Sequence, residues 1–375
     1  MAMREFRVWR WLGLLAALLL AACQTAPDRG EIGEPKESEE VSPLRVITGL
    51  QAPEDLELLP NDRYLLLSQF GGLEGGPGSL AVLDRHTEQH RLLYPSKALG
   101  PSEEARGAGE WGDPDCPGEP GAALSPHGIH LLQRPDGRWQ LLVVHHGGRE
   151  SVEFFELLGS GEDYRLRWRG CAVAPEDSFL NDVVGLRDGQ VLVTHMFSRR
   201  AAATPEGQAA ALAGELGGWV WRWRAGQGFD ILPGSHQVFP NGIQVDAEER
   251  HVYLNLYGAS AVARLELASG RVVRQARVPR PDNSSWAPDG RLLVASHVGS
   301  EVLDPACTRA DSPWCPLGFQ IVALDPETLH GEVIFRHQGA PMGAGTIAVQ
   351  HGRRLYIGSF VGDRLLVVDL DAWQP

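Results

Sequence analysis

The sequence has few cysteines and no excess of positive charge. Only five of the 375 residues are cysteine, and none is spaced as CxxC or with histidines at metal-ligand spacing, so we expect no structural zinc. The formal net charge of −14 at pH 7 argues against nucleic acid as a partner. A G-x-S-x-G motif is also absent, so Ser125 and Ser178 have no claim to be an activated nucleophile.

The hydrophobic run at the N-terminus, residues 11–22, is too short to span a bilayer. It follows three arginines and has the length of a signal-peptide core, so we predict that residues 1–22 direct export. The run ends in Leu-Ala-Ala-Cys, which resembles the bacterial lipobox and implies that Cys23 is lipidated. An ordinary signal peptide with a chance cysteine is the alternative. The lipid would anchor the protein in the bacterial cell envelope, with its domain in the periplasm or facing outside.

Residues 23–43 connect this signal to the rest of the chain. They are rich in Glu, Pro, Gly and Ser and lack apolar periodicity, so they cannot bury enough surface to fold. We predict a disordered acidic linker there. Residues 44–375 would then form one domain, because single all-β domains often exceed the usual domain length.

Four cysteines follow Cys23. An exported protein meets an oxidising compartment, in which disulfides form and persist. The local pair, Cys307 and Cys315, is the easiest to close. Whether Cys116 pairs with Cys171 stays open at this point.

One pattern repeats six times: a polar start, an alternating apolar stretch, a turn and a second apolar strand. The six copies begin at Pro53, Pro126, Leu180, Pro240, Pro281 and Met342. Several of the turns contain Asp-Gly, in which glycine supplies the positive φ that a hairpin turn needs. Unequal spacings of roughly 40 to 75 residues, without alternating helices, favour propeller blades over a parallel sheet. We therefore predict an all-β, six-bladed propeller.

Besides the six repeats, the sequence predicts outer strands, three core tryptophans and one helical insertion. Five apolar runs would serve as outer strands, and they begin at Gly78, Ser151, Ser260, Phe319 and Asp363. Trp219, Trp221 and Trp223 share one face by their spacing of two, so we expect them in the core between blades. Residues 198–218 are rich in alanine and predict a short helical insertion, which either covers the mouth of the channel or extends into solvent.

The polar starts of the repeats are the candidate site. In a propeller the innermost strands run along the central axis, so their first residues converge at one mouth. The converging polar residues are Glu54, Asp55, His127, Asn181, Asp182, Asn241, Asp282 and Asn283. Each alone reads as an ordinary turn residue. Their shared position favours a cation with six to eight oxygen ligands, which is Ca²⁺ rather than zinc.

Five stretches resemble, in the same order, parts of the paraoxonase/arylesterase family and, more distantly, the gluconolactonase-like calcium-dependent propellers. They are PEDLELLPN, PHGI with LLVVHH, LNDVVGL, FPNGIQV and PDNSSWAPDGRLLVASH. The resemblance covers roughly residues 44 to 372. It implies a six-bladed propeller with two Ca²⁺ ions in its channel, one catalytic and one structural.

The resemblance also implies roles for individual residues. The ligands of the catalytic ion would be Glu54, Asn181, Asn241, Asp282 and Asn283. The structural ion would be held by Asp55, Asp182 and the backbone carbonyl of Ile129. His127 would deprotonate the attacking water, and His146 would orient His127. The alternative for each histidine is a hydrogen-bonded structural residue at the channel wall.

The sequence departs from the family at three points. His145 precedes His146, so either histidine could face the site. The third repeat ends in THMF, where the animal enzymes carry Asn-Asp-His, which weakens any inference about substrate. The family's closing disulfide has no counterpart, so closure must depend on strand pairing, for which residues 44–50 and the last blade are candidates.

The leading functional hypothesis is a calcium-dependent hydrolase of small-molecule lactones or aryl esters, attached to the membrane by its N-terminal lipid. Ca²⁺ would polarise the carbonyl while a water activated by His127 attacks it, without a covalent intermediate. One alternative is a non-catalytic propeller, stabilised by calcium, that binds a partner in the envelope. Another is a sugar-lactone hydrolase of the gluconolactonase kind. The sequence does not identify the substrate, the oligomeric state or the membrane leaflet.

Overall fold

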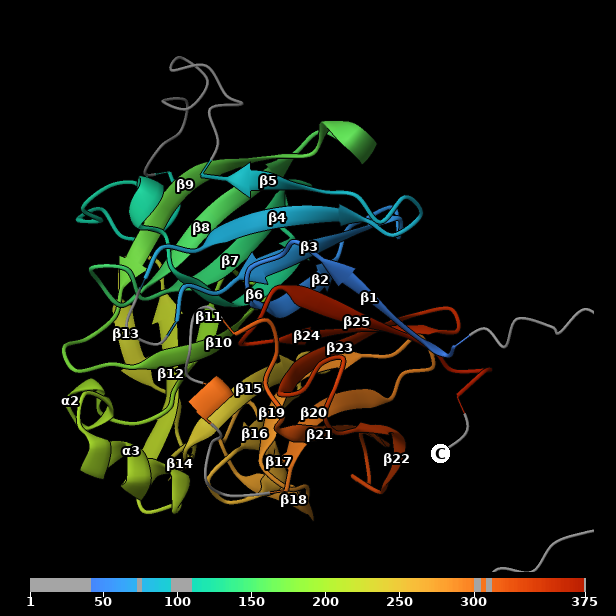
Figure 1. The fold of residues 1–375 in the computed structure, drawn as a ribbon. Coiled ribbons are helices and arrows are strands. Elements are labelled where there is room, and N and C mark those ends of the chain that lie inside the picture. The colour runs from blue at the N-terminus through green and yellow to red at the C-terminus, as the bar shows by residue number, and fades with distance from the viewer. Residues whose placement is uncertain (1–41, 73–75, 96–109, 300–304, 308–311, 374–375) are drawn as a thin grey trace, which may run out of the picture. The chain divides into compact units, whose positions relative to one another are not determined.

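The computed structural model describes residues 42–72, 76–95, 110–299, 305–307 and 312–373 (Figure 1). The predicted signal peptide, Cys23 and the linker up to residue 41 lie outside these residues. The described chain from Ser42 onward is a single compact unit. Within it, no helix is both long enough and apolar enough to cross a membrane.

In the described residues, six antiparallel sheets form the six predicted blades; five have four strands and one has a short fifth strand. Blade one consists of β2 (Pro53–Leu58), β3 (Tyr64–Gln69), β4 (Ser79–Asp84) and β5 (His90–Tyr94). Blade two consists of β6 (Pro126–Gln133), β7 (Trp139–His145), β8 (Ser151–Leu158) and β9 (Arg165–Val173). Blade three consists of β10 (Leu180–Gly185), β11 (Val191–His195), β12 (Gly217–Arg224) and β13 (Gly228–Ile231), and β14 (Gln237–Val238) pairs with β12.

The second half of the ring follows the same plan. Blade four consists of β15 (Pro240–Val245), β16 (His251–Leu256), β17 (Ala261–Glu266) and β18 (Val272–Arg277). Blade five consists of β19 (Pro281–Trp286), β20 (Leu292–Val298), β21 (Gly318–Leu324) and β22 (Gly331–His337). Blade six consists of β23 (Gly345–His351), β24 (Arg354–Ser359), β25 (Arg364–Asp369) and β1 (Leu44–Thr48). Each inner strand contacts the inner strands of both neighbouring blades, so the ring is closed.

Strand β1 closes the ring, as predicted. It pairs antiparallel with β25, in a register that sets Leu44 opposite Val368 and Thr48 opposite Arg364. The first residues of the domain therefore supply the outer strand of the last blade.

The hairpin turns have the chemistry that their sequences indicate. In the turn between β6 and β7, the Asp136 carboxylate accepts a hydrogen bond of 3.1 Å from the Arg138 amide, and Gly137 has a φ of +84°. The same arrangement recurs in the Asp-Gly turns that begin at Asp188 and Asp289. A side-chain acceptor followed by a left-handed glycine reverses the chain tightly and fixes the register of both strands.

The runs predicted as outer strands form the third strand of their blades, and a fourth strand lies outside each of them. These fourth strands are more polar, and in β18 four of the six residues are exposed and the other two are half-buried. Edge strands with such a composition lack the apolar alternation that marks a half-buried strand. Their sequences therefore gave no clear signal.

Apolar side chains from adjacent blades form the core. Trp223 packs against Phe154 of blade two, with ring centroids 5.2 Å apart, and Trp221 packs against the same cluster. The prediction of an inter-blade core is right for these two tryptophans. Trp219 differs, because its ring packs at a tilt against the His195 ring, with centroids 4.3 Å apart.

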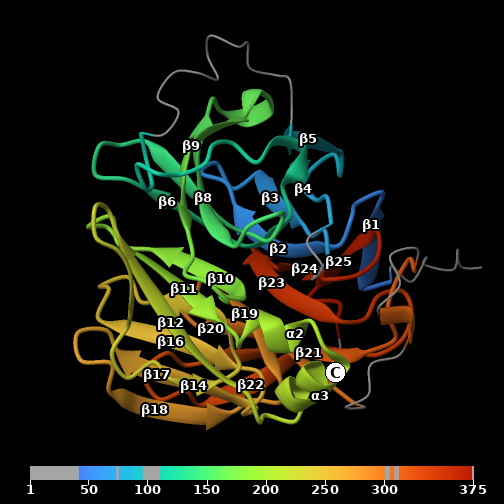
Figure 2. The same ribbon diagram turned by 90° about the vertical axis from the view of Figure 1, so that its left-hand side faces the viewer.

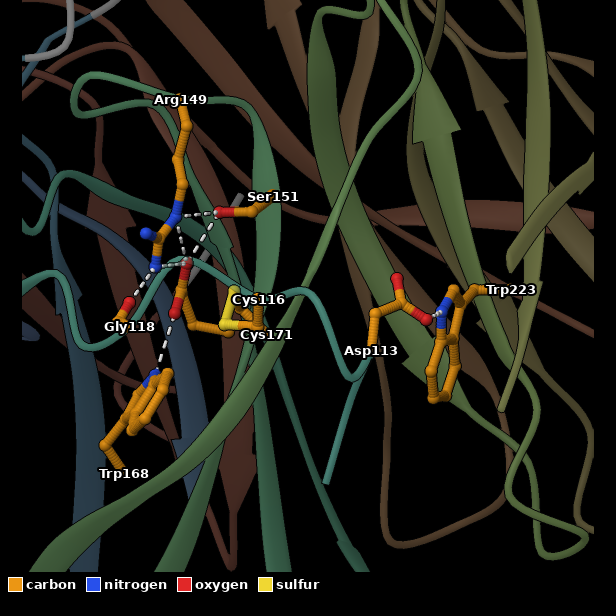
Figure 3. Close-up of a disulfide and its surroundings, with 9 residues drawn as sticks. Asp113, Cys116, Gly118, Arg149, Ser151, Trp168, Cys171 and Trp223 are labelled. Carbon is orange, nitrogen blue, oxygen red and sulfur yellow. Dashed lines mark hydrogen bonds and ion pairs between the residues drawn. A yellow bond between two sulfur atoms is a disulfide. The ribbon is translucent and has the colours of Figure 1, made fainter. Parts of the chain in front are cut away.

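Two disulfides are present. Cys307 pairs with Cys315, which are eight residues apart, and Cys116 pairs with Cys171 at a Cα–Cα distance of 5.5 Å. The second bond ties the segment before β6 to β9 of the same blade (Figure 3). Nearby, Asp113 accepts a hydrogen bond of 2.9 Å from the Trp223 indole, which connects this segment to blade three.

The predicted insertion contains two short helices, α2 (Arg199–Ala202) and α3 (Pro205–Leu212), which lie side by side (Figure 2). The side chains of Ser198 and Thr204 cap their N-termini. Both helices pack on an aromatic cluster at the starts of blades three and four. Its buried members are Phe179, Met196, Phe197, Ala211, Phe239 and Tyr257. Of the two alternatives, the structure therefore supports an insertion packed beside the mouth of the channel.

Candidate metal and hydrolytic site

A β-bulge at the start of every inner strand builds the site. In blade two, Pro126 lies opposite His145 and Ile129 opposite Val143, so two residues of β6 face one residue of β7. The five other inner strands have the same interruption at the equivalent place. A bulge redirects side chains that would otherwise alternate across the sheet. The eight polar residues predicted to converge all lie in these bulges and are all buried.

Close approach of neighbouring blades explains the glycine in the repeated frames PHGI and PNGI. A Cβ atom on Gly128 would lie 2.5 Å from the Asp182 Cα, and one on Gly242 would lie 2.5 Å from the Asp282 carbonyl oxygen. No side chain fits at those distances. The frame therefore repeats because each inner strand passes close to the backbone of the next blade.

Asp55 and Asp182 link adjacent blades. The Asp55 carboxylate accepts hydrogen bonds from the Leu56 amide at 2.8 Å and from the Ile129 amide at 2.7 Å. Asp182 accepts in the same way from its neighbour Val183 and from Ile243 of the next blade. Each carboxylate oxygen thus has one backbone donor and keeps a lone pair. The observed Ile129 contact involves its amide, whereas the predicted role in a structural calcium site is that of its carbonyl.

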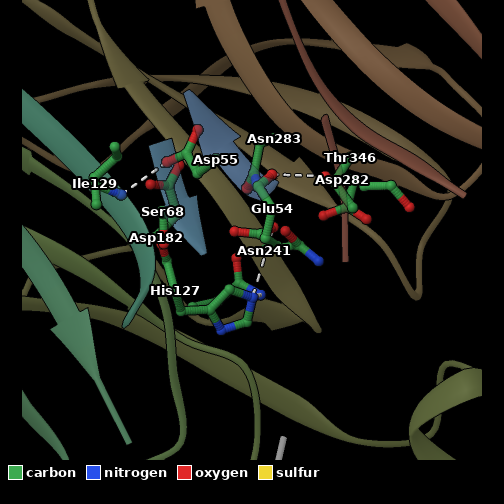
Figure 4. Close-up of polar contacts among 12 residues, drawn as sticks. Glu54, Asp55, Ser68, His127, Ile129, Asp182, Asn241, Asp282, Asn283 and Thr346 are labelled. Atoms are coloured by element: carbon green, nitrogen blue, oxygen red, sulfur yellow. Dashed lines mark hydrogen bonds and ion pairs between the residues drawn. The ribbon is translucent and has the colours of Figure 1, made fainter. Parts of the chain in front are cut away.

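Four of the five predicted ligands of the catalytic ion, Glu54, Asn241, Asp282 and Asn283, lie together beside His127 (Figure 4). The side chain of the fifth, Asn181, contacts the His127 ring. Glu54 Oε1 accepts a hydrogen bond of 2.6 Å from the Asn283 side-chain amide, and Asn241 hydrogen-bonds to Asp282. Four buried oxygens of this group have no hydrogen-bond partner within the described residues. They are Glu54 Oε2, Asn181 Oδ1, Asn241 Oδ1 and Asn283 Oδ1.

These unpartnered oxygens call for a ligand. A buried acceptor without a partner destabilises a protein by about 1–3 kcal/mol, so four in one place are costly unless something binds them. A cation with oxygen ligands would satisfy all four. In the described residues no group of three or more His, Cys, Asp or Glu side chains is arranged to hold a metal. The donor set therefore depends on amide oxygens, which suit Ca²⁺ and not zinc.

The electrostatics agree with this fit. Burial, reinforced by repulsion from Asp55, Asp282 and Asp182, raises the pKa of Glu54 well above its usual value. Burial raises the pKa of Asp282 to about 8 and that of Asp55 to about 7. Carboxyl groups shifted in this way are held in a strained, desolvated state that a divalent cation would relieve.

His127 and His146 form a hydrogen-bonded pair that continues to a carboxylate. His127 Nδ1 lies 2.8 Å from His146 Nε2, and His146 Nδ1 lies 2.8 Å from Glu150 Oε1. Since a carboxylate accepts, His146 carries its proton on Nδ1, and its Nε2 accepts from His127 Nδ1–H. His127 Nε2 is left without a proton. It accepts a long hydrogen bond of 3.5 Å from Asn181 Nδ2 and lies 3.6 Å from Glu54 Oε1.

Burial, with a smaller contribution from His146, lowers the pKa of His127 well below 6.5. The imidazole is therefore neutral at pH 7, as a proton acceptor must be.

His146, and not His145, contacts His127. His145 Nδ1 accepts a hydrogen bond of 3.0 Å from the Ser125 amide, so this histidine holds the chain before β6. His195 does the same in blade three, where its Nδ1 accepts a hydrogen bond of 3.0 Å from the Phe179 amide. The two adjacent histidines, which the sequence could not rank, thus face opposite sides of β7.

Four further residues at the site were not predicted from the sequence: His297, Tyr257, Glu150 and Arg199. His297 Nε2 lies 3.6 Å from Asp282 Oδ2, and its Nδ1 lies 3.1 Å from the Tyr257 hydroxyl. These two side chains line a cavity of about 570 Å³ that reaches the helical insertion. His297 ends a second strand, as His195 does, so the frame could have identified it. Glu150 and Arg199 lie in a loop and in the insertion, where no repeat marks them.

No protein-family model matches the chain, and no curated protein is similar to it in sequence. Solved structures are similar in fold. A gluconolactonase from Xanthomonas campestris, described as important in glucose secondary metabolic pathways, is 16% identical with a TM-score of 0.51, over 87% of this chain and 89% of that one. A luciferin-regenerating enzyme is 13% identical with a TM-score of 0.51, over 87% and 95%. At such identities the likeness shows the fold alone: this chain is a six-bladed propeller.

Proposed function

We propose that the protein is a calcium-dependent hydrolase of small-molecule lactones or aryl esters. One observation carries the proposal: four unpartnered buried oxygens lie beside the unprotonated Nε2 of a neutral histidine. The oxygens suit a hard cation, and the histidine suits a water that must lose a proton. A purely structural calcium site would need the oxygens but not the histidine pair.

Two calcium ions fit the chain. The catalytic ion would be held by Glu54, Asn181, Asn241, Asp282 and Asn283. When bound there, Ca²⁺ supplies positive charge to the carbonyl oxygen of the substrate, where negative charge develops. The second ion would be held by Asp55, Asp182 and the Ile129 carbonyl, and would join the blades that these aspartates already link.

The protein side chains handle the proton. His127 Nε2 accepts a proton from water, which makes that water a stronger nucleophile at the ester carbon. The resulting positive charge spreads through Nδ1–H to His146, whose own Nδ1–H is bonded to Glu150. Bonds of this kind stabilise an imidazolium, as the orienting carboxylate does in a Ser-His-Asp triad.

The substrate would occupy the cavity beside the ion. Leu212 and Ala213 of the insertion line this cavity together with Tyr257 and His297. Apolar and polar walls together suit an acyl or aromatic group attached to an ester.

Sugar lactones form a second candidate class, because a solved structure of the same fold is named a gluconolactonase. They belong in the same substrate panel.

We also propose that Cys23 is lipidated, so that the domain works at the bacterial cell envelope, beginning with β1 directly after the linker. Labelled fatty acid incorporated into the protein, and lost in Cys23→Ser, would support this.

Two variants of the full-length protein test the proposed chemistry. His127→Gln should lower kcat by about 100- to 10,000-fold while calcium binding, measured by equilibrium dialysis with ⁴⁵Ca, is retained. Asn241→Ala should lose both turnover and one bound ion. His195→Gln is the matched control, because His195 is buried at an equivalent strand end but bonds only to backbone. Full turnover in His127→Gln would contradict the proposal.

A further inference from the structure

We propose that Glu150 is a positioning residue of this site: it fixes the tautomer of the histidine pair and is itself held by Arg199 of the helical insertion. The inference builds on the proposed function, because it assigns to His127 the role of base. It concerns residues outside the five ligands and the histidine pair. It gives the insertion a chemical connection to the site.

Three groups donate hydrogen bonds to the Glu150 carboxylate. Its Oε1 accepts from His146 Nδ1 at 2.8 Å and also contacts the Arg199 guanidinium. Its Oε2 accepts from the Leu180 amide at 3.1 Å. The Glu150 side chain is only 8% exposed, so this carboxylate has exchanged its water almost entirely for these three donors.

The three donors belong to three different parts of the fold. His146 directly follows β7 of blade two, Leu180 is the first residue of β10 in blade three, and Arg199 begins α2. Leu180 immediately precedes Asn181, one of the proposed calcium ligands. A single carboxylate therefore joins the histidine pair, the strand that carries Asn181, and the insertion.

Phe179 completes this connection. Its ring centroid lies 5.5 Å from that of His146, and the Arg199 guanidinium carbon lies 5.3 Å from the same Phe179 ring. The guanidinium is thus fixed by an ion pair and by an aromatic face at once. The geometry restricts where Arg199 can lie, and with it the first turn of the insertion.

The charge of Glu150 determines which ring nitrogen of His146 carries the proton. A carboxylate can only accept, so it requires the proton of His146 on Nδ1. His146 Nε2 must then accept from His127 Nδ1–H, which leaves His127 Nε2 free to take a proton. A neutral amide at position 150 could donate or accept. The reverse chain would then be allowed, and in it His127 Nε2 carries a proton and cannot act as a base.

Three variants of the full-length, calcium-loaded protein test this inference. Glu150→Gln keeps the size of the side chain and removes its charge, and Arg199→Met removes the guanidinium. Arg200→Met is the matched control, since Arg200 is the neighbouring residue of α2 and its side chain is 74% exposed and paired at the surface with Glu176. Arg199→Lys tests whether a cation alone restores the contact.

We expect Glu150→Gln to lower kcat about 10- to 100-fold with KM unchanged, less than the about 10⁴-fold effect of the directly bonded carboxylate in a serine protease triad. Arg199→Met should lower kcat by a smaller factor, Arg199→Lys should recover part of it, and Arg200→Met should match the wild type. ¹⁵N-histidine correlation spectra at fixed pH report the tautomer directly. They should show His127 Nε2 unprotonated in the wild type and partly protonated in Glu150→Gln.

An unchanged kcat in Glu150→Gln would overturn the inference, and so would a reduced kcat with the His127 tautomer unchanged, because the effect would then be structural. If the wild type hydrolyses no ester or lactone, the proposed function fails by itself. The ¹⁵N spectra still test in that case whether Glu150 fixes the tautomer of the histidine pair. A tautomer shift in Glu150→Gln supports it, and identical spectra refute it.

Discussion

The substitution Asp282→Asn should change stability in opposite directions with and without calcium. Without calcium, Asp282 is a buried carboxyl group whose pKa rises to about 8 because burial removes its water. Asparagine has nearly the same shape and carries no charge. The substitution should therefore relieve a cost in the calcium-free protein and remove a ligand in the calcium-bound protein.

The magnitude follows from linkage. A carboxyl group whose pKa is raised by folding stabilises the protein fully below its usual pKa of 3.8, and this contribution is lost as the pH rises toward about 8. The free energy of unfolding falls by about 1.4 kcal/mol per pH unit in that window, or roughly 6 kcal/mol in all. The calcium-free wild type should thus be less stable at pH 8 than at pH 5, and Asp282→Asn should show a shallower loss.

Calcium should reverse the order of the two proteins. A ligand at 100 times its Kd stabilises the folded state by about 2.7 kcal/mol, and Asp282→Asn should forfeit most of that. Urea unfolding of the full-length protein at pH 5 and pH 8, with calcium or with chelator, measures all four conditions. Asp188→Asn, at an exposed turn, is the control and should follow the wild type throughout. An Asp282→Asn protein that is less stable than the wild type at pH 8 in chelator would refute the reasoning.

The geometry also predicts the effects of other changes. His146→Gln should lower turnover at least about tenfold, whereas His145→Gln, which loses a bond to backbone, should lower the melting temperature with turnover largely kept. Gly128→Ala should destabilise the protein by about 1–3 kcal/mol in urea unfolding, because its Cβ meets neighbouring backbone at 2.5 Å; an unchanged midpoint would contradict the close packing of blades. Replacing both Cys116 and Cys171 by alanine should lower the free energy of unfolding by about 4 kcal/mol, since the bond closes a loop of 55 residues; a loss below 1 kcal/mol would show that this loop is already ordered when reduced.

The fold could be predicted because one frame repeats. Pro126-His127-Gly128-Ile129 and its five relatives mark the start of each inner strand, and the six starts fix the number of blades. The closing pair of β1 and β25 could be anticipated because both segments are apolar and had no other partner. The fourth strands of the other five blades could not be anticipated, since strands such as β18 are exposed on both faces and lack an alternating pattern.

The polar ring could be predicted because position in the frame determines which side chains point into the channel. Contacts between segments far apart in sequence could not. Glu150 and Arg199 lie outside the frame, and the frame does not show which of His145 and His146 contacts His127. Trp219 has the same spacing of two as Trp221 and Trp223, but its ring contacts His195. The spacing alone cannot show that contact.

The most direct test of the central claim is the hydrolysis of a panel of aryl esters, aliphatic lactones and sugar lactones by the full-length protein, before and after removal of calcium with a chelator and again after calcium is restored. The account predicts activity on at least one class that disappears with the chelator and returns with calcium but not with magnesium. Activity that persists in the metal-free protein, or no hydrolysis of any substrate by the calcium-saturated protein, would contradict it.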